Sequence, residues 1–156
     1  MPYLAYFLTW TTYGAWLHGD ERESADDRHN MPGTPYLEPE PARVERMRER
    51  MSERPFTLEP EARAIVDHAI RTVARNREWT IHALNVRSNH VHAVVRAPSH
   101  TPEIVTKQFK AWSTRALQDA GTGTDRARFW TRMGSTRWVN TETSLHAAID
   151  YVLNHQ

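Results

Sequence analysis

Residues 79–97 decide the fold: they read WTIHALNV at 79–86, RSN at 87–89 and HVHAVVRA at 90–97. Both long segments are rich in β-branched and aliphatic residues, which favours strands. The three residues between them include Ser and Asn, which are typical of turns. The stretch therefore predicts two strands joined as a hairpin.

Alternation along the second of these strands separates two faces. Successive side chains of a strand point to opposite sides, so Val91, Ala93 and Val95 share one face and His90 and His92 share the other. The small apolar face suits packing under helices. The opposite face sets two imidazoles side by side, where neutral ring nitrogens can bind one metal ion. A His-x-His pair is also common without any metal, so the spacing alone leaves the ordinary structural role open.

The flanking segments complete the order of elements. Residues 3–12 are aromatic and β-branched, as in a buried strand. Residues 101–120 predict a helix, 129–139 a strand bent near Gly134, and 141–155 a last helix that begins at a polar cap. A helix after residue 58 is predicted by an apolar stripe of period 3.6: Ala62, Ile65, Val66, Ala69, Ile70 and Val73.

This order, β-α-β-β-α-β-α, predicts an α+β protein. Its first six elements match the ferredoxin-like split βαβ arrangement, a four-stranded antiparallel sheet with two helices on one face. The other face is left for the last helix. We expect one domain over residues 1–156, with an insertion at about 13–56 that is rich in proline, glycine and charge and includes a short helix at 43–51.

Composition narrows the class of protein. No apolar run approaches the length of a membrane span, and no signal peptide is visible at the N-terminus, so we expect a cytoplasmic protein without a membrane partner. The absence of cysteine excludes disulfides and thiolate chemistry. Residues 1–78 have a net charge of −3 and residues 79–156 one of +4. Such an asymmetry fits a polyanion partner, although arginine-rich composition alone can also produce it.

The last helix adds a candidate nucleophile. Its apolar stripe consists of Leu145, Ala148, Ile149 and Val152. Tyr151 and His155 lie one turn apart on a flank of that stripe. If the stripe packs on the open face of the sheet, this flank overhangs His90 and His92. Tyr151 can otherwise be an aromatic residue at the edge of the core, and His155 a solvated C-terminal residue.

A tyrosine beside a metal site is suited to cleaving a phosphodiester. A phenol, with a pKa near 10, is a weak nucleophile at neutral pH. A Lewis acid that polarises the phosphate and stabilises the developing charge offsets this weakness, while the tyrosine becomes covalently linked to the phosphate.

Four motifs resemble the single-tyrosine HUH transposases, and among them the REP-associated tyrosine transposases and related insertion-sequence transposases. In chain order they are YFLTWTTYGAWLHGDER at 6–22, SNHVHAVV at 88–95, FWTRMGSTRWV at 129–139 and AIDYVLNHQ at 148–156. The resemblance implies a ferredoxin-like fold and Mg²⁺ or Mn²⁺ as cofactor. It also implies a 5′-phosphotyrosine intermediate on single-stranded DNA, often beside a hairpin, and a 3′-hydroxyl that reverses the reaction for strand transfer.

The resemblance assigns roles to individual residues. The HUH histidines match His90 and His92, and the nucleophile matches Tyr151. In the family, a polar residue one helical turn after the tyrosine, commonly Gln or Asn, completes the metal site. That position is His155 here, flanked by Asn154 and Gln156. The expected metal ligands are therefore His90, His92 and His155, with the third open between these neighbours.

DNA-binding residues are expected in two regions. Basic side chains interleaved with Phe129, Trp130 and Trp138 are typical of a groove for a single strand, although the aromatic residues can equally be core and the arginines a solvated rim. The candidates are Lys107, Lys110, Arg115, Arg128, Arg132 and Arg137.

Three functions remain open at this point. The first is a metal-dependent single-stranded DNA endonuclease and strand transferase, acting as a monomer or a homodimer. The second is a non-catalytic hairpin-binding protein of the same fold, domesticated or decayed. The third is an RNA-recognition domain, which the positions of His90 and His92 disfavour because that fold needs aromatic residues on its central strands.

Overall fold

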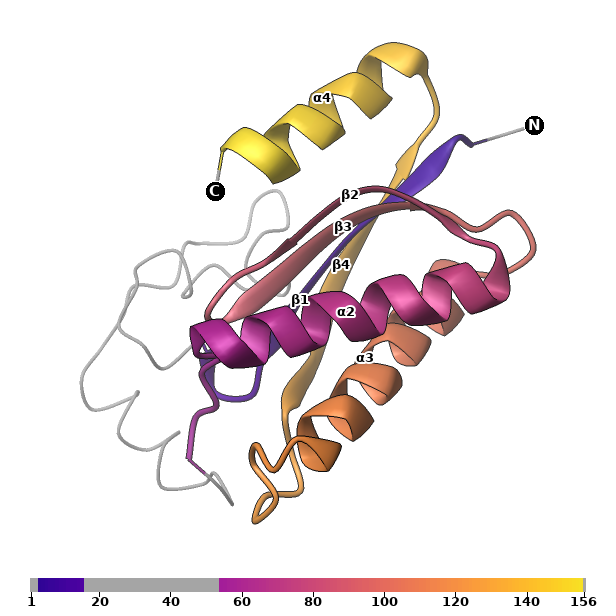
Figure 1. Ribbon diagram of the computed structural model, residues 1–156. Helices are drawn as coiled ribbons and strands as arrows, with labels where there is room; N and C mark the ends of the chain where they lie inside the picture. The colour runs from indigo at the N-terminus through magenta and orange to yellow at the C-terminus, as the bar shows by residue number, and fades with distance from the viewer. Residues whose placement is uncertain (1–2, 16–53, 156) are drawn as a thin grey trace.

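A computed structural model describes residues 3–15 and 54–155 (Figure 1). The predicted helix at 43–51, most of the 13–56 insertion and Gln156 lie outside these residues. The elements in chain order are β1 (Ala5–Thr12), α2 (Pro60–Arg77), β2 (Thr80–Val86), β3 (His90–Arg96), α3 (Pro102–Asp119), β4 (Trp130–Val139) and α4 (Glu142–Asn154).

The four strands form one antiparallel sheet in the order β2-β3-β1-β4. Helices α2 and α3 cover one face and α4 crosses the other (Figure 1). The fold class predicted from the order of elements is confirmed. Within the described residues, no helix combines the length and apolarity that crossing a membrane requires.

The main core lies between the sheet and the α2–α3 layer. The residues predicted to face the helices, Val91, Ala93 and Val95, are fully buried there. Leu8 and Trp10 of β1 join them, since their alternation places them on the same side of the sheet. Burial of a valine or leucine side chain such as Val91, Val95 or Leu8 contributes about 1.5–3 kcal/mol.

A second, smaller core holds α4 on the opposite face. Leu145, Ala148 and Val152 of α4 are buried against sheet residues that include Val94 and Val139. The predicted apolar stripe of the last helix is therefore its packing face. The helix begins at Thr141, whose hydroxyl accepts a hydrogen bond from the Ser144 amide at 3.0 Å, as an N-cap does.

Gly134 permits a close approach of β4 to β1. A Cβ at this position would lie 2.8 Å from the carbonyl oxygen of Thr9, closer than a real Cβ contact allows. The register between the two strands shifts just beyond this point, between Trp10 and Thr12. The bend expected near Gly134 thus coincides with an irregularity in the pairing of β1 and β4.

Both described ends of the insertion adjoin the turn between β2 and β3. The amide of Thr12 donates to the Asn89 carbonyl at 2.9 Å, and the amide of Leu58 donates to the Ser88 carbonyl at 2.7 Å. The amide of Phe56 also donates to the Tyr13 carbonyl at 2.8 Å. The chain therefore leaves the sheet and returns to it beside His90.

Candidate functional site

A row of four polar side chains crosses the sheet on the face that α4 partly covers. In the strand register, Asn85 of β2 lies opposite His92 of β3, His92 opposite Thr9 of β1, and Thr9 opposite Ser135 of β4. Directly paired residues in antiparallel strands point to the same face. The fold therefore assembles this row from all four strands, of which β1 and β4 are far from the β2–β3 hairpin in the sequence.

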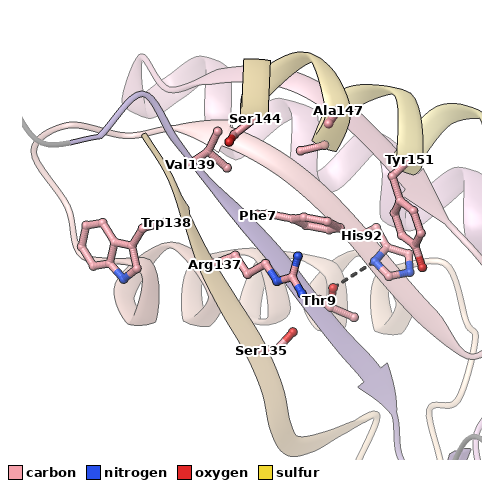
Figure 2. A pocket seen from close by; sticks show the side chains of 11 residues that line it. Phe7, Thr9, His92, Ser135, Arg137, Trp138, Val139, Ser144, Ala147 and Tyr151 are labelled. Atoms are coloured by element: carbon pink, nitrogen blue, oxygen red, sulfur yellow. Dashed lines mark hydrogen bonds between the residues drawn. The ribbon is translucent and has the colours of Figure 1, made fainter. Parts of the chain in front are cut away.

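His90 and His92 lie next to each other, as their spacing predicted. Their ring centroids are 4.7 Å apart. The Nδ1 atom of His92 is 2.9 Å from the Thr9 hydroxyl (Figure 2), and Nδ1 of His90 donates to the Asn89 side-chain oxygen at 2.8 Å. Each ring is thus oriented through Nδ1, and Nε2 is the ring nitrogen that would bind a metal.

Burial keeps His92 neutral. Its side chain is only 9% exposed, and this desolvation lowers the pKa of His92 to about 4, with further lowering from the neighbouring His90 and Arg87. A metal ion binds the neutral imidazole, so proton competition at His92 is weak at physiological pH.

Tyr151 extends from α4 toward His92, as Figure 2 shows. Its ring centroid lies 5.9 Å from that of His92 and 5.9 Å from that of Phe7. The side chain is 46% exposed, so a large substrate can reach it. The structure therefore brings His90, His92 and Tyr151 together, and the ring centroid of His155 lies 6.5 Å from that of Tyr151.

Asn85 attaches the C-terminal turn of α4 to the sheet. The last carbonyl groups of a helix have no partner within it. Here the Asn85 amide donates to the Val152 carbonyl at 2.9 Å. Because Val152 follows Tyr151 and Asn85 lies opposite His92, this bond fixes the tyrosine turn above the histidine pair.

We expect Asn85→Ala to loosen that turn by about 1 kcal/mol, the usual net value of such a bond. Amide hydrogen exchange in peptides covering residues 148–155 should then become about fivefold faster. The matched control is Asn76→Ala on the exposed side of α2, which should leave this exchange unchanged. Equal exchange in the two variants would contradict the role given to Asn85.

The low pKa of His92 predicts a pH-dependent stability in the metal-free protein. The unfolded chain binds this proton near pH 6.5, and the folded chain does so only near pH 4. Between these values the unfolded state binds more protons, so the stability contributed by neutral His92 is complete above pH 6.5 and is lost as the pH falls toward 4. The full effect is about 3 kcal/mol.

Urea unfolding in EDTA at pH 7.5 and pH 4.5 measures this difference. His92→Gln keeps a side-chain amide beside Thr9 but cannot titrate, so its stability should fall less than that of the wild type over the same interval. If the two proteins lose the same stability, His92 does not carry the proton linkage.

A pocket of about 610 Å³ adjoins the site on the side of β4. Phe7, Thr9 and His92 form its floor, and Ser135 and Arg137 line it from β4 (Figure 2). The α4 side contributes Ser144, Ala147, Ala148 and Tyr151. Tyr151 and His92 therefore stand at one end of a space large enough for part of a substrate.

The ring of His155 is nearly parallel to that of Tyr151, with centroids 6.5 Å apart, and it also pairs with Asp150. His155 caps the C-terminus of α4, and its Nε2 atom is 2.8 Å from the Asp150 carboxylate. The amide of Asn154 donates to the same carboxylate at 2.8 Å. These two hydrogen bonds, that of Asn154 first, lower the pKa of Asp150. Both described candidates for a third metal ligand thus contact Asp150, and residues 3–15 and 54–155 contain no cluster of three His, Asp or Glu side chains arranged to hold an ion.

The histidine pair itself fits a divalent ion. Two adjacent imidazoles, each oriented through Nδ1 by an oxygen, are a common pattern among metal-binding histidines. Water or phosphate oxygens would have to supply the remaining ligands. The chemistry of His90 and His92 is therefore compatible with Mn²⁺ or Mg²⁺, while His155 as third ligand stays a prediction.

Arg137 is the only one of the six predicted DNA-binding residues that lines the pocket. Lys107 and Arg115 are exposed on α3, on the opposite side of the sheet. Lys110 is half-buried, and its ammonium group donates to the Thr131 carbonyl at 2.9 Å, tying α3 to β4. Desolvation lowers its pKa, which favours a structural role.

Arg128 and Arg132 are exposed near the start of β4. The guanidinium of Arg128 lies 5.9 Å from the centre of the Tyr13 ring, so it contacts the described start of the insertion. These two arginines lie away from the pocket.

The aromatic residues expected to stack on bases divide between core and surface. Phe129 is 2% exposed and belongs to the core. Trp130 is half-buried and donates from its indole nitrogen to the Thr114 hydroxyl at 3.0 Å. Trp138 is 53% exposed, but its ring points away from the pocket (Figure 2) and packs edge-on against Tyr3 and Tyr6.

Four residues of the site were not predicted from the sequence: Phe7, Thr9, Asn85 and Ser135. Thr9 orients His92, Asn85 holds α4, and Phe7 contacts both rings at the site. A strand sequence gives the face of each residue but not its partner on a distant strand. Only their position on the same face as the histidines could have indicated them.

A family of transposases shares this sequence pattern. The family model described as "Transposase IS200 like" matches residues 49–155. The match covers more than half of the chain and includes the histidine pair and the tyrosine helix. The chain belongs to the IS200-like transposase family. A search of curated proteins finds no match.

Two solved structures resemble the fold. One is a REP-associated tyrosine transposase bound to a REP hairpin, with a TM-score of 0.57 and 14% identity over 97% of this chain. This chain covers 66% of that protein, slightly less than two thirds. The other, a crystal structure of a protein from Deinococcus radiodurans R1 assigned as a transposase, has a TM-score of 0.49 and 17% identity, covering 100% of this chain and 93% of that one. At such identities the first likeness supports the fold alone.

Proposed function

We propose that the protein is a metal-dependent single-stranded DNA endonuclease and strand transferase that acts through a covalent 5′-phosphotyrosine intermediate. The observation that carries this proposal is the position of Tyr151, whose ring lies 5.9 Å from that of His92 on the row shared with Thr9 and Asn85. Membership of the IS200-like transposase family is consistent with this chemistry.

In the proposed reaction, the Tyr151 hydroxyl oxygen bonds to the scissile phosphorus as the bond from phosphorus to the 3′ oxygen breaks. The tyrosine loses its proton and the departing oxygen gains one, leaving a 3′-hydroxyl end and a 5′-phosphate on the protein. Attack of a 3′-hydroxyl on the phosphotyrosine reverses the step and joins strands. A divalent ion bound by His90 and His92 would polarise the phosphate.

The protein's own residues prepare this step. Thr9 and Asn89 orient the two imidazoles, and burial keeps His92 neutral. Asn85 fixes the turn that presents Tyr151. Because α4 packs on the sheet of its own chain, we propose that Tyr151 acts with the histidines of the same chain.

Single-stranded DNA beside a hairpin is the proposed substrate. A structural relative is bound to a REP hairpin, and the pocket next to Tyr151 has one basic side chain and no acidic one among the described residues that line it. These features favour a polyanionic strand over a small neutral substrate.

The proposal is tested with a pool of single-stranded DNA that contains hairpins of random sequence. The protein is incubated with the pool and Mn²⁺ or Mg²⁺, and complexes that survive denaturing gel electrophoresis are isolated and sequenced. We expect a metal-dependent adduct on a restricted set of hairpins, and its absence throughout the pool would refute the enzymatic function.

A non-catalytic hairpin-binding protein is the second candidate. It is favoured by the contacts of His155 and Asn154 with Asp150, because they leave His90 and His92 as the two described ligands of the proposed metal site. Selective capture of hairpins in native gels without any adduct would support this alternative.

A further inference from the structure

The floor of the pocket beside Tyr151 is aromatic, whereas its rim has basic and hydroxyl side chains. Phe7 lies on the floor (Figure 2), and Ala147 and Ala148 line the pocket from α4 with small side chains. Flat aromatic groups stack on such surfaces. The inner part of the pocket therefore suits a planar group the size of a nucleobase.

The rim of the pocket suits a phosphate. Arg137 extends from β4 toward the pocket (Figure 2), and no acidic residue is among the described lining residues. Serine hydroxyls from Ser135 and Ser144 flank the same space. A guanidinium with hydroxyl donors nearby is a common phosphate-binding combination.

Arg137 lies next to the aromatic floor of the pocket. It is paired with Phe7 across β4 and β1, and the ring centroid of Phe7 lies 5.9 Å from that of Tyr151. A nucleotide whose base stacks on Phe7 would therefore lie between Arg137 and Tyr151. Since β4 is an edge strand, the DNA can pass over the sheet edge.

We propose that this pocket binds the nucleotide next to the scissile phosphate, with its base against Phe7 and its phosphate on Arg137. The inference rests on the proposed function in one respect, because it takes Tyr151 to stand at the scissile phosphate. Ala147 and Ala148 keep the space for the base open, and Arg137 sets how far the strand advances past the tyrosine.

Binding without cleavage tests the proposal. Fluorescence anisotropy in EDTA measures the affinity for a labelled pool of random single-stranded 30-mers and for an abasic strand of equal length. Ala147→Phe fills the pocket and should weaken binding to the 30-mers about tenfold, within the range that stacking of a base contributes. The affinity for the abasic strand should change little. His146→Phe, on an exposed position of α4 outside the pocket, is the matched control for folding and hydrophobicity.

Arg137→Gln should weaken binding to both strands. The slope of log affinity against log salt should become shallower by about 0.7, the value for one phosphate contact on a single strand. Arg75→Gln, an exposed residue of α2 on the other side of the sheet, should change neither quantity.

Two results would overturn the proposal: equal affinities of Ala147→Phe and His146→Phe, or an equal loss for Ala147→Phe on the normal and abasic strands. A failure of the proposed enzymatic function gives a different result. In that case the variants still change DNA binding as expected, but the wild type forms no covalent adduct.

Discussion

Tyr151→Phe is expected to abolish the covalent protein–DNA adduct, with a decrease of at least about a thousandfold. Removal of the atom that forms the bond to phosphorus leaves no route to a phosphotyrosine, and loss of a nucleophile commonly costs this much or more. The phenylalanine ring retains the contacts with Phe7 and His92. Because Tyr151 is 46% exposed, stability and DNA binding should change little.

The measurement is the denaturing-gel assay on a hairpin recovered from the random pool, with anisotropy for binding. The matched control is Tyr3→Phe, which also removes a phenolic oxygen, in this case one that donates to the Ala97 carbonyl at 3.3 Å; Tyr3 is not among the residues that line the pocket. An adduct that persists in Tyr151→Phe would assign the nucleophile to another residue, which peptide mass spectrometry of the adduct would identify.

The order of elements and the two faces of β3 could be predicted because they depend on local periodicity. Val91, Ala93 and Val95 alternate with the histidines, and that alternation alone fixes which side faces the helices. The stripe of α4 likewise predicted its packing face, and with it the side on which Tyr151 lies. These features need only the neighbouring residues in the sequence.

The supporting residues of the site could not be predicted because they depend on the register between distant strands. Thr9 meets His92 across a separation of 83 residues in the chain, and Asn85 reaches Val152 across 67. The family resemblance implied that His155, or one of its neighbours, completes the metal site. In the structure the His155 ring lies beside Tyr151 and pairs with Asp150, and its role as a ligand stays a prediction. The His155 imidazole can either hydrogen-bond to Asp150 or bind a metal ion with His90 and His92. The periodicity of the sequence does not distinguish these two roles.

Replacing both His90 and His92 by alanine is expected to remove metal-dependent adduct formation, by at least about a hundredfold, because the phosphate would lose its Lewis acid. His92 is nearly buried and hydrogen-bonded to Thr9. Some loss of stability, about 1–2 kcal/mol, is therefore expected as well. Isothermal titration with Mn²⁺ separates the two effects, since the folded double variant should no longer bind the ion.

The control is the double variant His68→Ala/His146→Ala, which removes two exposed histidines from α2 and α4 and should keep both Mn²⁺ binding and adduct formation.

Mixing the His90/His92 variant with Tyr151→Phe then tests whether the tyrosine and the histidines of one site come from the same chain. If each chain uses its own tyrosine, as the packing of α4 on its own sheet implies, the mixture stays inactive. Recovery of activity would mean that the tyrosine helix is exchanged between chains. Unchanged cleavage by the His90/His92 double variant alone would mean that the metal binds at other residues. The position of Tyr151 beside His92 would then no longer support its role as the nucleophile.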